Sequence, residues 1–308
     1  MQSRRCPFCL SDSSRFIGIR VDVLVKCQNC RSVFRDITQA KFQQIHCEAF
    51  QDREFIEASI TLTGRGPSSS LWDALSLSGT SVLEIGPGSG HLLAAAHKAG
   101  CSVEAVESSE VHRNYIRDTW GISALYSTMD EIPDNRTFDA IVAINVFEHI
   151  YDIGSFLRAI RKNLAPGGTF FLSTPNAVSL EATVLGSWWS MCKVHDHVSF
   201  PSAAGLAIAA GASGLCVERV WSSGLPFEFP VSALTAVRDR SRTRRGIGKA
   251  TGDGQAQVPA ETIRAGTVNP ATKATLARFY SVAAPFDPTS RLLGALGRAG
   301  SIKARFTH

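Results

Sequence analysis

The chain contains 308 residues, of which 44% are hydrophobic and 19% are charged, which favours a globular protein with one large domain and small appendages. No apolar run follows the first arginines, and the uncharged stretch 197–217 is interrupted by Pro201, glycines and serines, so neither a signal peptide nor a membrane span is predicted and we expect a cytoplasmic protein. The net charge of +5 comes from residues 238–249, which we interpret as a solvated helix end, with contact to RNA, phosphate or an acidic membrane surface as the alternative.

The first feature along the chain is a pair of C-x-x-C motifs separated by 17 residues. This spacing is typical of a zinc site in which each motif directs two thiolates at one tetrahedral ion. The predicted ligands are Cys6, Cys9, Cys27 and Cys30. Residues 15–25 between the motifs are rich in Ile and Val and predict two short strands. Residues 1–37 are therefore predicted to form a zinc ribbon, and a four-thiolate shell without an open position favours a structural role over catalysis.

A connector follows the predicted ribbon. Apolar residues recur at roughly helical spacing over residues 38–61, so we expect a helix there. Residues 63–70 contain glycine, proline and serine and mark a break. The connector is placed at residues 38–66, before the main domain.

A glycine-rich turn is the most informative segment of the chain. The buried strand pattern Val82–Ile85 contains Glu84 and is followed by Gly86, Gly88 and Gly90, and then by a helical run. Such a turn lets a ligand lie against bare backbone, and the helix N-terminus offers free N–H groups to it. A dinucleotide motif would place its third glycine at His91, where it is absent, so the spacing argues against that class of ligand.

A second acidic residue supports a ligand that contains ribose. Glu107 ends the strand pattern Val103–Val106 and lies 21 positions after Gly86. A carboxylate there is an acceptor that suits two neighbouring ribose hydroxyls.

The E-x-G-x-G-x-G spacing resembles motif I of the class I S-adenosylmethionine-dependent methyltransferases. Three later blocks resemble segments of the same superfamily, in the usual order; they are Phe138–Ile150, Leu164–Asn176 and His197–Gly211. The last block is similar to that of bacterial small-molecule and sugar methyltransferases related to the ubiquinone-type enzymes. The resemblance covers roughly residues 67–222 and implies S-adenosylmethionine as the cofactor.

The resemblance also implies which residues bind the cofactor. They are Glu84, Gly86, Gly88, Gly90, Glu107, Ser108, Met129 and Asn145. One position departs from the family pattern: five residues before Pro133, where an acid usually binds the adenine amine, this chain has Thr128. We expect Met129 to pack on the adenine ring, and Asp130 to replace the missing acid if the register shifts by one residue.

Strand and helix patterns alternate through the main domain. Strands are expected near residues 80–85, 102–107, 122–126, 138–144, 168–174 and 214–222, and helices near 89–99, 109–119, 152–164 and 201–211. This alternation predicts a doubly wound, Rossmann-like and mostly parallel sheet, with ligands at the carboxyl ends of its strands. The methyltransferase domain is placed at 67–222. Residues 223–308 are predicted to be an extension with a linker and helices, which either covers the substrate site or supports a homodimer.

Three histidines near the predicted rim are candidate proton acceptors. His197 is ranked first because it aligns with a histidine of the resembled family, and His149 and His195 follow. Trp188, Trp189 and Phe200 in the same region either form the wall of an apolar pocket or belong to the core.

The leading functional hypothesis is S-adenosylmethionine-dependent methylation of a small molecule or glycan, on oxygen, with assistance from histidine. An RNA methyltransferase that uses the zinc ribbon and the basic segment is one alternative. A non-catalytic interaction protein that kept the fold is the other.

Overall fold

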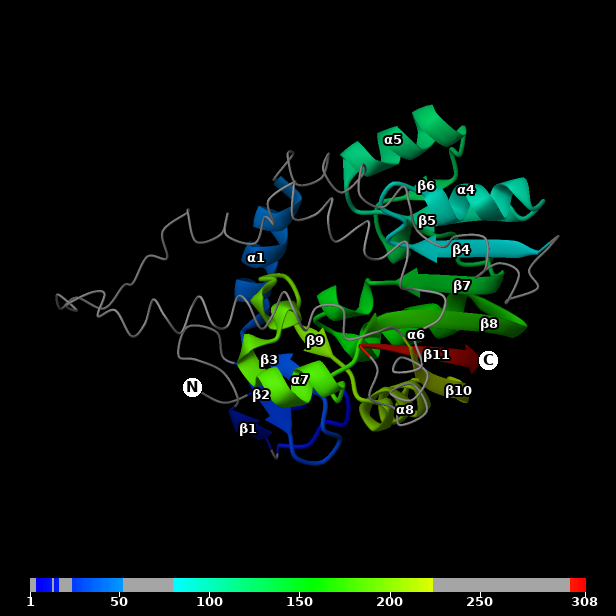
Figure 1. Cartoon of the computed structure of the whole chain (residues 1–308). Helices are drawn as coiled ribbons and strands as arrows, with labels where there is room; N and C mark the ends of the chain where they lie inside the picture. Colours follow the sequence, from blue (N-terminus) through cyan, green and yellow to red (C-terminus); the bar gives the residue numbers. More distant parts are fainter. Residues whose placement is uncertain (1–3, 13, 17–23, 52–79, 224–299) are drawn as a thin grey trace, which may run out of the picture.

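The computed structural model describes residues 4–12, 14–16, 24–51, 80–223 and 300–308. Its central element is a seven-stranded sheet in the order β10-β11-β8-β7-β4-β5-β6 (Figure 1). The strands are β4 (Ser81–Ile85), β5 (Ser102–Val106), β6 (Leu125–Tyr126), β7 (Phe138–Ile144), β8 (Leu164–Pro175), β10 (Cys216–Ser223) and β11 (Ser301–Thr307). Neighbouring strands from β8 to β6 pair in parallel, whereas β11 runs antiparallel to both β8 and β10. The predicted doubly wound, mostly parallel fold is confirmed.

Helices cover both faces of this sheet because its strands are apolar on both sides. Alternate residues of one strand enter different cores: Leu83 and Ile85 belong to one cluster, and Val82 to the other. The first cluster contains side chains of α6 (Ile153–Asn163) and α8 (Ala203–Ala212). The second contains side chains of α4 (His91–Lys98) and α5 (Glu110–Trp120). These four helices correspond to those expected from the sequence.

The strand registers fix where a ligand can bind. Ile85 at the end of β4 is level with Val106 on β5 and with Ala143 on β7. The segments that follow these three strands therefore leave the sheet at the same edge. The connection after β4 leads to α4 and the connection after β7 leads to α6, on opposite faces, so the crevice between them is the usual ligand position in open α/β sheets.

The last strand of the sheet corrects one expectation. The sequence predicts a linker and helices over residues 223–308, but β11 lies between β8 and β10, with Ile302, Ala304 and Phe306 buried. The Phe306 ring stacks on Phe170 with centroids 5.5 Å apart. The three buried residues alternate with Lys303 and Arg305, which is the period-two pattern of a strand and not the spacing of a helix. The rest of the predicted extension, including the basic segment, lies outside the described residues, and the domain division stays a prediction.

A second, smaller sheet joins the N-terminal region to the main domain. Its antiparallel order is β1-β2-β3-β9, formed by β1 (Ser14–Phe16), β2 (Leu24–Cys27), β3 (Val33–Arg35) and β9 (Ser199–Phe200). The two strands expected between the cysteine motifs are present as β1 and β2. In contrast, β9 comes from the far end of the predicted methyltransferase domain, so this sheet pairs segments more than 160 residues apart.

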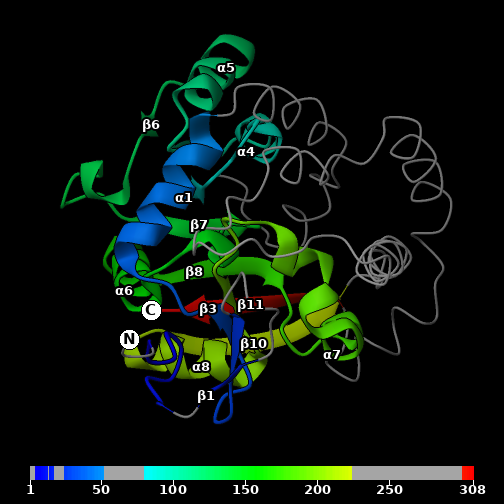
Figure 2. The same ribbon diagram turned by 90° about the vertical axis from the view of Figure 1, so that its left-hand side faces the viewer.

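The remaining elements are helices outside the two sheets and the four helices already described. The helix α1 (Gln39–Gln51) lies within the predicted connector and leads away from the small sheet in the direction of α5 (Figure 2). The others are α7 (Leu180–Leu185) and the short 3₁₀ helices Met129–Glu131, Phe147–His149, Gly186–Trp188 and Ser190–Lys193. Among the described residues, no helix has the length and apolar character that a membrane span requires.

Candidate active site

The glycine turn after β4 has the backbone conformation that its sequence predicts. Gly86, Gly88 and Gly90 have φ values of +62°, +55° and +73°, in the left-handed region that favours glycine. A Cβ atom on Gly86 would come within 2.6 Å of a Val146 methyl group, and one on Gly90 within 2.8 Å of an Ile116 side-chain carbon. A Cβ on Gly88 would meet no atom of the described residues within 4 Å. The turn is therefore closely packed at its two ends and open in the middle, where a ligand can approach the backbone.

Two buried carboxyl groups lie beside this turn. Glu107 accepts hydrogen bonds from the backbone N–H of Gly88 at 3.1 Å and of Ser109 at 2.8 Å. Glu84 is 4% exposed, and its Oε2 atom has no hydrogen-bond partner among the described residues. Burial, with the Glu107 charge nearby, raises the pKa of Glu84 to about 8. A buried acid with a free oxygen suits a ligand that carries a positive charge, and Glu107 remains an acceptor for hydroxyl groups.

The other predicted cofactor residues lie around the same rim. Ser108 is exposed, and its carbonyl accepts a hydrogen bond from Arg113. Met129 begins a 3₁₀ helix and packs against the first core cluster, and Asn145 directly follows β7 with a φ of +54°. Their contact with a cofactor stays a prediction, as does the role of Asp130, which is exposed.

A cluster of polar side chains follows β7 on the same edge. His149, at the end of the 3₁₀ helix Phe147–His149, places Nδ1 3.0 Å from Oδ2 of Asp196. The rings of His149 and His197 meet edge to face, with centroids 4.6 Å apart. Beside them, Glu148 accepts a 2.9 Å hydrogen bond from the Thr174 hydroxyl. A carboxylate oxygen of Glu148 and a ring nitrogen of each of His149 and His197 lie within 4.8 Å of one another. Protonation of one of these groups therefore affects protonation of the others.

The surroundings shift the pKa values of the two clustered histidines, His149 and His197, in opposite directions. Burial opposes protonation of His149, but the hydrogen bond to Asp196 and the charges of Asp196 and Glu148 outweigh it and raise its pKa. For Asp196 burial is likewise outweighed by His149, which lowers the pKa of the acid to about 2. Burial and the neighbouring His149 lower the pKa of His197 to about 3, and its Nδ1 lies 3.2 Å from the Met191 carbonyl. Protonation is thus favoured at His149 and opposed at His197, which stays neutral.

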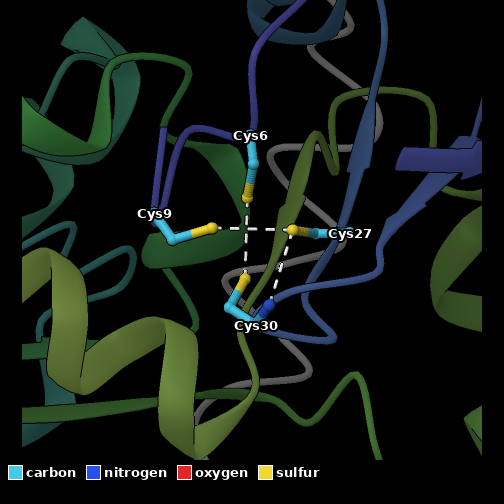
Figure 3. Close-up of side chains that lie close together, drawn as sticks. All are labelled: Cys6, Cys9, Cys27 and Cys30. Carbon is cyan, nitrogen blue, oxygen red and sulfur yellow. Dashed lines mark hydrogen bonds between the residues drawn. The ribbon is translucent and has the colours of Figure 1, made fainter. Parts of the chain in front are cut away.

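The four cysteines of the predicted ribbon point their sulfur atoms at a common centre (Figure 3). The Sγ atoms of Cys6 and Cys30 are 3.6 Å apart, those of Cys9 and Cys27 are 3.5 Å apart, and all four lie within 4.8 Å of one another. Four thiolates bound to one zinc at about 2.3 Å would be roughly 3.8 Å apart in tetrahedral geometry. The hydrogen bond from Cys6 lowers the pKa of Cys30 to about 5, so a thiolate is already favoured there. The donor set and spacing fit a closed tetrahedral site.

Residues 38–220 match a family described as a methyltransferase domain, which is more than half of the chain. The chain belongs to this methyltransferase family. A ubiquinone biosynthesis O-methyltransferase of Methylocella silvestris is 30% identical over 152 residues, covering 45% of this chain and 59% of the relative. The human mitochondrial ubiquinone biosynthesis O-methyltransferase is 30% identical over 116 residues, covering 34% of this chain and 31% of the relative. The matched region spans about half the length of the curated relatives.

Solved structures resemble the methyltransferase more weakly. A cyclopropane synthase from Mycobacterium tuberculosis has a TM-score of 0.49 at 15% identity, covering 78% of this chain and 83% of the other. A putative sarcosine dimethylglycine methyltransferase from Galdieria sulphuraria has a TM-score of 0.47 at 16% identity, covering 78% and 84%. These values are too low to carry an argument about function. The predicted resemblance to class I methyltransferases is confirmed at the level of the family and the fold.

The structure of the methyltransferase brings together some predicted site residues and leaves others apart. Glu84, Glu107 and the three glycines surround one turn, and His149 meets His197. His195 is exposed and does not belong to the cluster. Trp189 is 2% exposed, and its ring packs on that of Phe200 with centroids 5.3 Å apart within a core cluster, which is the second of the two roles considered for these two residues.

Sequence reasoning did not identify two residues of the site. Asp196 stands between two histidine candidates in the sequence, and this H-D-H triplet was a usable signal for a carboxylate–imidazole pair. Arg35 lies in β3, is 1% exposed, and contacts the segment that carries Asp196. No local pattern indicated it, because a single arginine in a ribbon strand is ordinarily a surface residue.

Proposed function

We propose that this methyltransferase transfers a methyl group from S-adenosylmethionine to a hydroxyl oxygen of a small molecule or glycan. The observation that carries the proposal is the His149–Asp196 pair, which follows β7 at the edge where the glycine turn leaves β4. The family of the chain supports methyl transfer, and the O-methyltransferase names of its relatives support oxygen as the accepting atom.

The residues at the turn fit the proposed cofactor. Glu84, with its buried free oxygen, would hold the ammonium group, and Glu107 would accept hydrogen bonds from the ribose hydroxyls. The open backbone at Gly88 would lie against the ligand. When bound, the cofactor supplies an electrophilic methyl group on a sulfonium, which leaves the protein to align the acceptor and to remove its proton.

His149 is proposed as the proton acceptor. Asp196 binds Nδ1–H and leaves Nε2 as the basic atom, so the imidazole is held in one tautomer. With the cofactor bound, the proton of the acceptor hydroxyl would pass to Nε2 as the oxygen takes the methyl group, and the methyl–sulfur bond would break to leave a neutral thioether. His197 stays neutral beside it and adds no competing charge, which keeps His149 available as the base. These assignments reverse the order in which the sequence ranked His197 and His149.

A structural zinc ion held by Cys6, Cys9, Cys27 and Cys30 is part of the proposal. The sulfur positions support it, and a shell of four thiolates leaves no position for a substrate. The ion would fold the ribbon rather than take part in methyl transfer. Elemental analysis of the purified chain should give one zinc per chain, and Cys27→Ser should abolish it.

The proposal is tested with tritium-labelled S-adenosylmethionine and three acceptor sets: simple phenols and catechols, free sugars, and total RNA. We expect label in a phenol, catechol or sugar, and none in the matched O-methyl ether, which has no hydroxyl proton to lose. Label in RNA would select the RNA alternative instead. Calorimetry that detects no binding of S-adenosylmethionine would leave the non-catalytic alternative.

A further inference from the structure

The segment that carries Asp196 and His197 is wrapped around one side chain of the ribbon. The Arg35 guanidinium donates from Nε to the His197 carbonyl at 2.8 Å, and from Nη2 to the carbonyls of Cys192 at 2.7 Å and Val194 at 3.0 Å. The Arg35 backbone N–H adds a 3.0 Å bond to the Val198 carbonyl. Four carbonyls of residues 192–198 are thus held by one residue of β3.

The chemistry of Arg35 explains why this arrangement is specific. A buried guanidinium must direct its donors at acceptors, because an unpaired buried charge is costly. The carbonyls of residues 194–198, which belong to no helix or strand, need donors for the same reason. The planar fork of arginine satisfies several carbonyls in one fixed geometry, which the single ammonium of lysine does not reproduce. Arg35 therefore fixes the path of the backbone on which Asp196 lies.

The other partner of the pair also rests on the ribbon. Phe8, between the ligands Cys6 and Cys9, packs against the fully buried Phe147 with ring centroids 6.2 Å apart. Arg4 lies 3.7 Å above the Tyr151 ring, so ribbon residues contact both sides of the 148–150 segment. The segments of the two partners are also joined to each other, because the Val198 N–H donates to the Glu148 carbonyl at 2.7 Å.

The cofactor turn has different neighbours. The described contacts of Gly86, Gly88 and Gly90 are with Val146, Glu107 and α5, which belong to the main domain. The ribbon therefore supports the acceptor side of the site, which carries His149 and Asp196. The seven-stranded sheet and its helices support the cofactor side, which is the glycine turn with Glu84 and Glu107.

We propose that Arg35 is a positioning residue for methyl transfer. Through Arg35, the ribbon that carries the four cysteines holds Asp196 against His149. This inference rests on the proposed function for its effect on turnover. The placement of Asp196 against His149 is measurable without an acceptor.

The test compares Arg35→Met, Arg35→Lys and the control Arg5→Met, which removes an exposed ribbon arginine whose ion-pair partner in the described part of the chain is the surface residue Asp12. NMR titration of the His149 imidazole reports the Asp196 contact. The charged or titratable groups around it are His46, Glu148, Asp196, His197 and, through His197, Arg35. We expect Arg35→Met to keep one zinc and its S-adenosylmethionine affinity within twofold, while the His149 titration moves toward that of an ordinary histidine and kcat falls at least tenfold. Arg35→Lys should lie in between, and Arg5→Met should match the wild type.

Arg35→Met and Arg35→Lys that fold, titrate at His149 and turn over like the wild type would overturn the proposal. If the wild type shows no methyl transfer, the proposed function fails, while the titration still decides the role of Arg35. Hydrogen exchange on wild-type protein, with and without chelation of zinc, covers the case in which both variants misfold. We expect faster exchange at residues 192–200 and unchanged exchange at 84–90. Equal protection of 192–200 in both states, or loss of protection throughout the sheet, would count against it.

Discussion

The two sides of the candidate site are built in different ways. The cofactor side is local: Glu84 and the glycine turn occupy seven consecutive residues, and Glu107 is set beside them by the register of two adjacent strands. The acceptor side is assembled from Arg35, His149 and Asp196, and more than 100 sequence positions separate Arg35 from the other two. A local site can be recognised from a motif, whereas an assembled site depends on packing between distant segments.

The two sides also differ in what holds them. Backbone conformation dominates the cofactor side, where glycines occupy positions that other residues would strain. Buried charged groups dominate the acceptor side, where Arg35, Glu148 and the His149–Asp196 pair each depend on partners from another segment. Removing one partner of a buried charged pair typically costs about 3–5 kcal/mol, so we expect the acceptor side to be the more sensitive to substitution.

Loss of the proposed base should give the largest effect on turnover. His149→Gln is expected to lower kcat roughly 100-fold, the usual contribution of a general base, and to leave the cofactor Kd within twofold. His97→Gln, an exposed histidine at the end of α4, is the control and should be unaffected. A full rate in His149→Gln would return His197 or His195 to first place.

The same pair predicts a pH profile. A base must be unprotonated to act, so the rate should rise with pH through the pKa of His149, which lies above its ordinary value. Asp196→Asn removes the charge that favours the imidazolium, and the rising limb should therefore move to lower pH. A limb that stays in place would show that Asp196 does not act on the titrating group.

Two glycines of α8 test the contact between the ribbon and the main domain. A Cβ on Gly205 would overlap the Ser32 hydroxyl and lie 3.2 Å from the Cys30 sulfur, whereas one on Gly211 would meet nothing within 4 Å in the part of the chain that the structure describes. Gly205→Ala should lower the free energy of unfolding by about 2 kcal/mol through overpacking. Gly211→Ala should raise it by up to about 1 kcal/mol through helix propensity. Urea denaturation measures both, and equal signs would contradict the packing described for α8.

The cofactor side should respond to Glu107→Ala. Loss of the ribose acceptor is expected to weaken S-adenosylmethionine binding at least tenfold, or about 1.4 kcal/mol, by calorimetry. Glu110→Ala, an exposed acid in the first turn of α5, provides the matched control. An unchanged Kd in Glu107→Ala would place the ribose elsewhere.

The sequence predicts well where one signal is strong and local. Ile153, Phe156, Leu157 and Ile160 repeat at helical spacing, and α6 buries all four. The glycine turn and the cysteine spacing each require a special backbone or ligand geometry, and the structure has the expected turn conformation and sulfur cluster. These features follow from contacts over a few residues or from side-chain chemistry that has few alternative uses.

Prediction fails where the deciding contact is distant. The period-two pattern of residues 301–307 is compatible with a strand, but nothing near residue 301 indicates that its place is between β8 and β10. Asp196 gains its meaning from His149, and Arg35 from four carbonyls of residues 192–198. Burial of a charged residue depends on partners that sequence proximity does not supply, so single charged residues default to the surface in a sequence-based reading.

The smallest expected effect is the release of a proton by Glu84 when the cofactor binds. Glu84 has a pKa of about 8 without cofactor, so at pH 7 it is mostly protonated. A bound ammonium group favours the carboxylate and lowers this pKa, so binding should release most of one proton at pH 7 and less as the pH rises toward 8. Calorimetry in phosphate and in Tris, which differ in ionisation enthalpy, measures the release. S-adenosylhomocysteine keeps the ammonium and lacks the sulfonium charge, so equal release with both ligands assigns Glu84 to the ammonium. Release that persists in Glu84→Gln would instead come from another group.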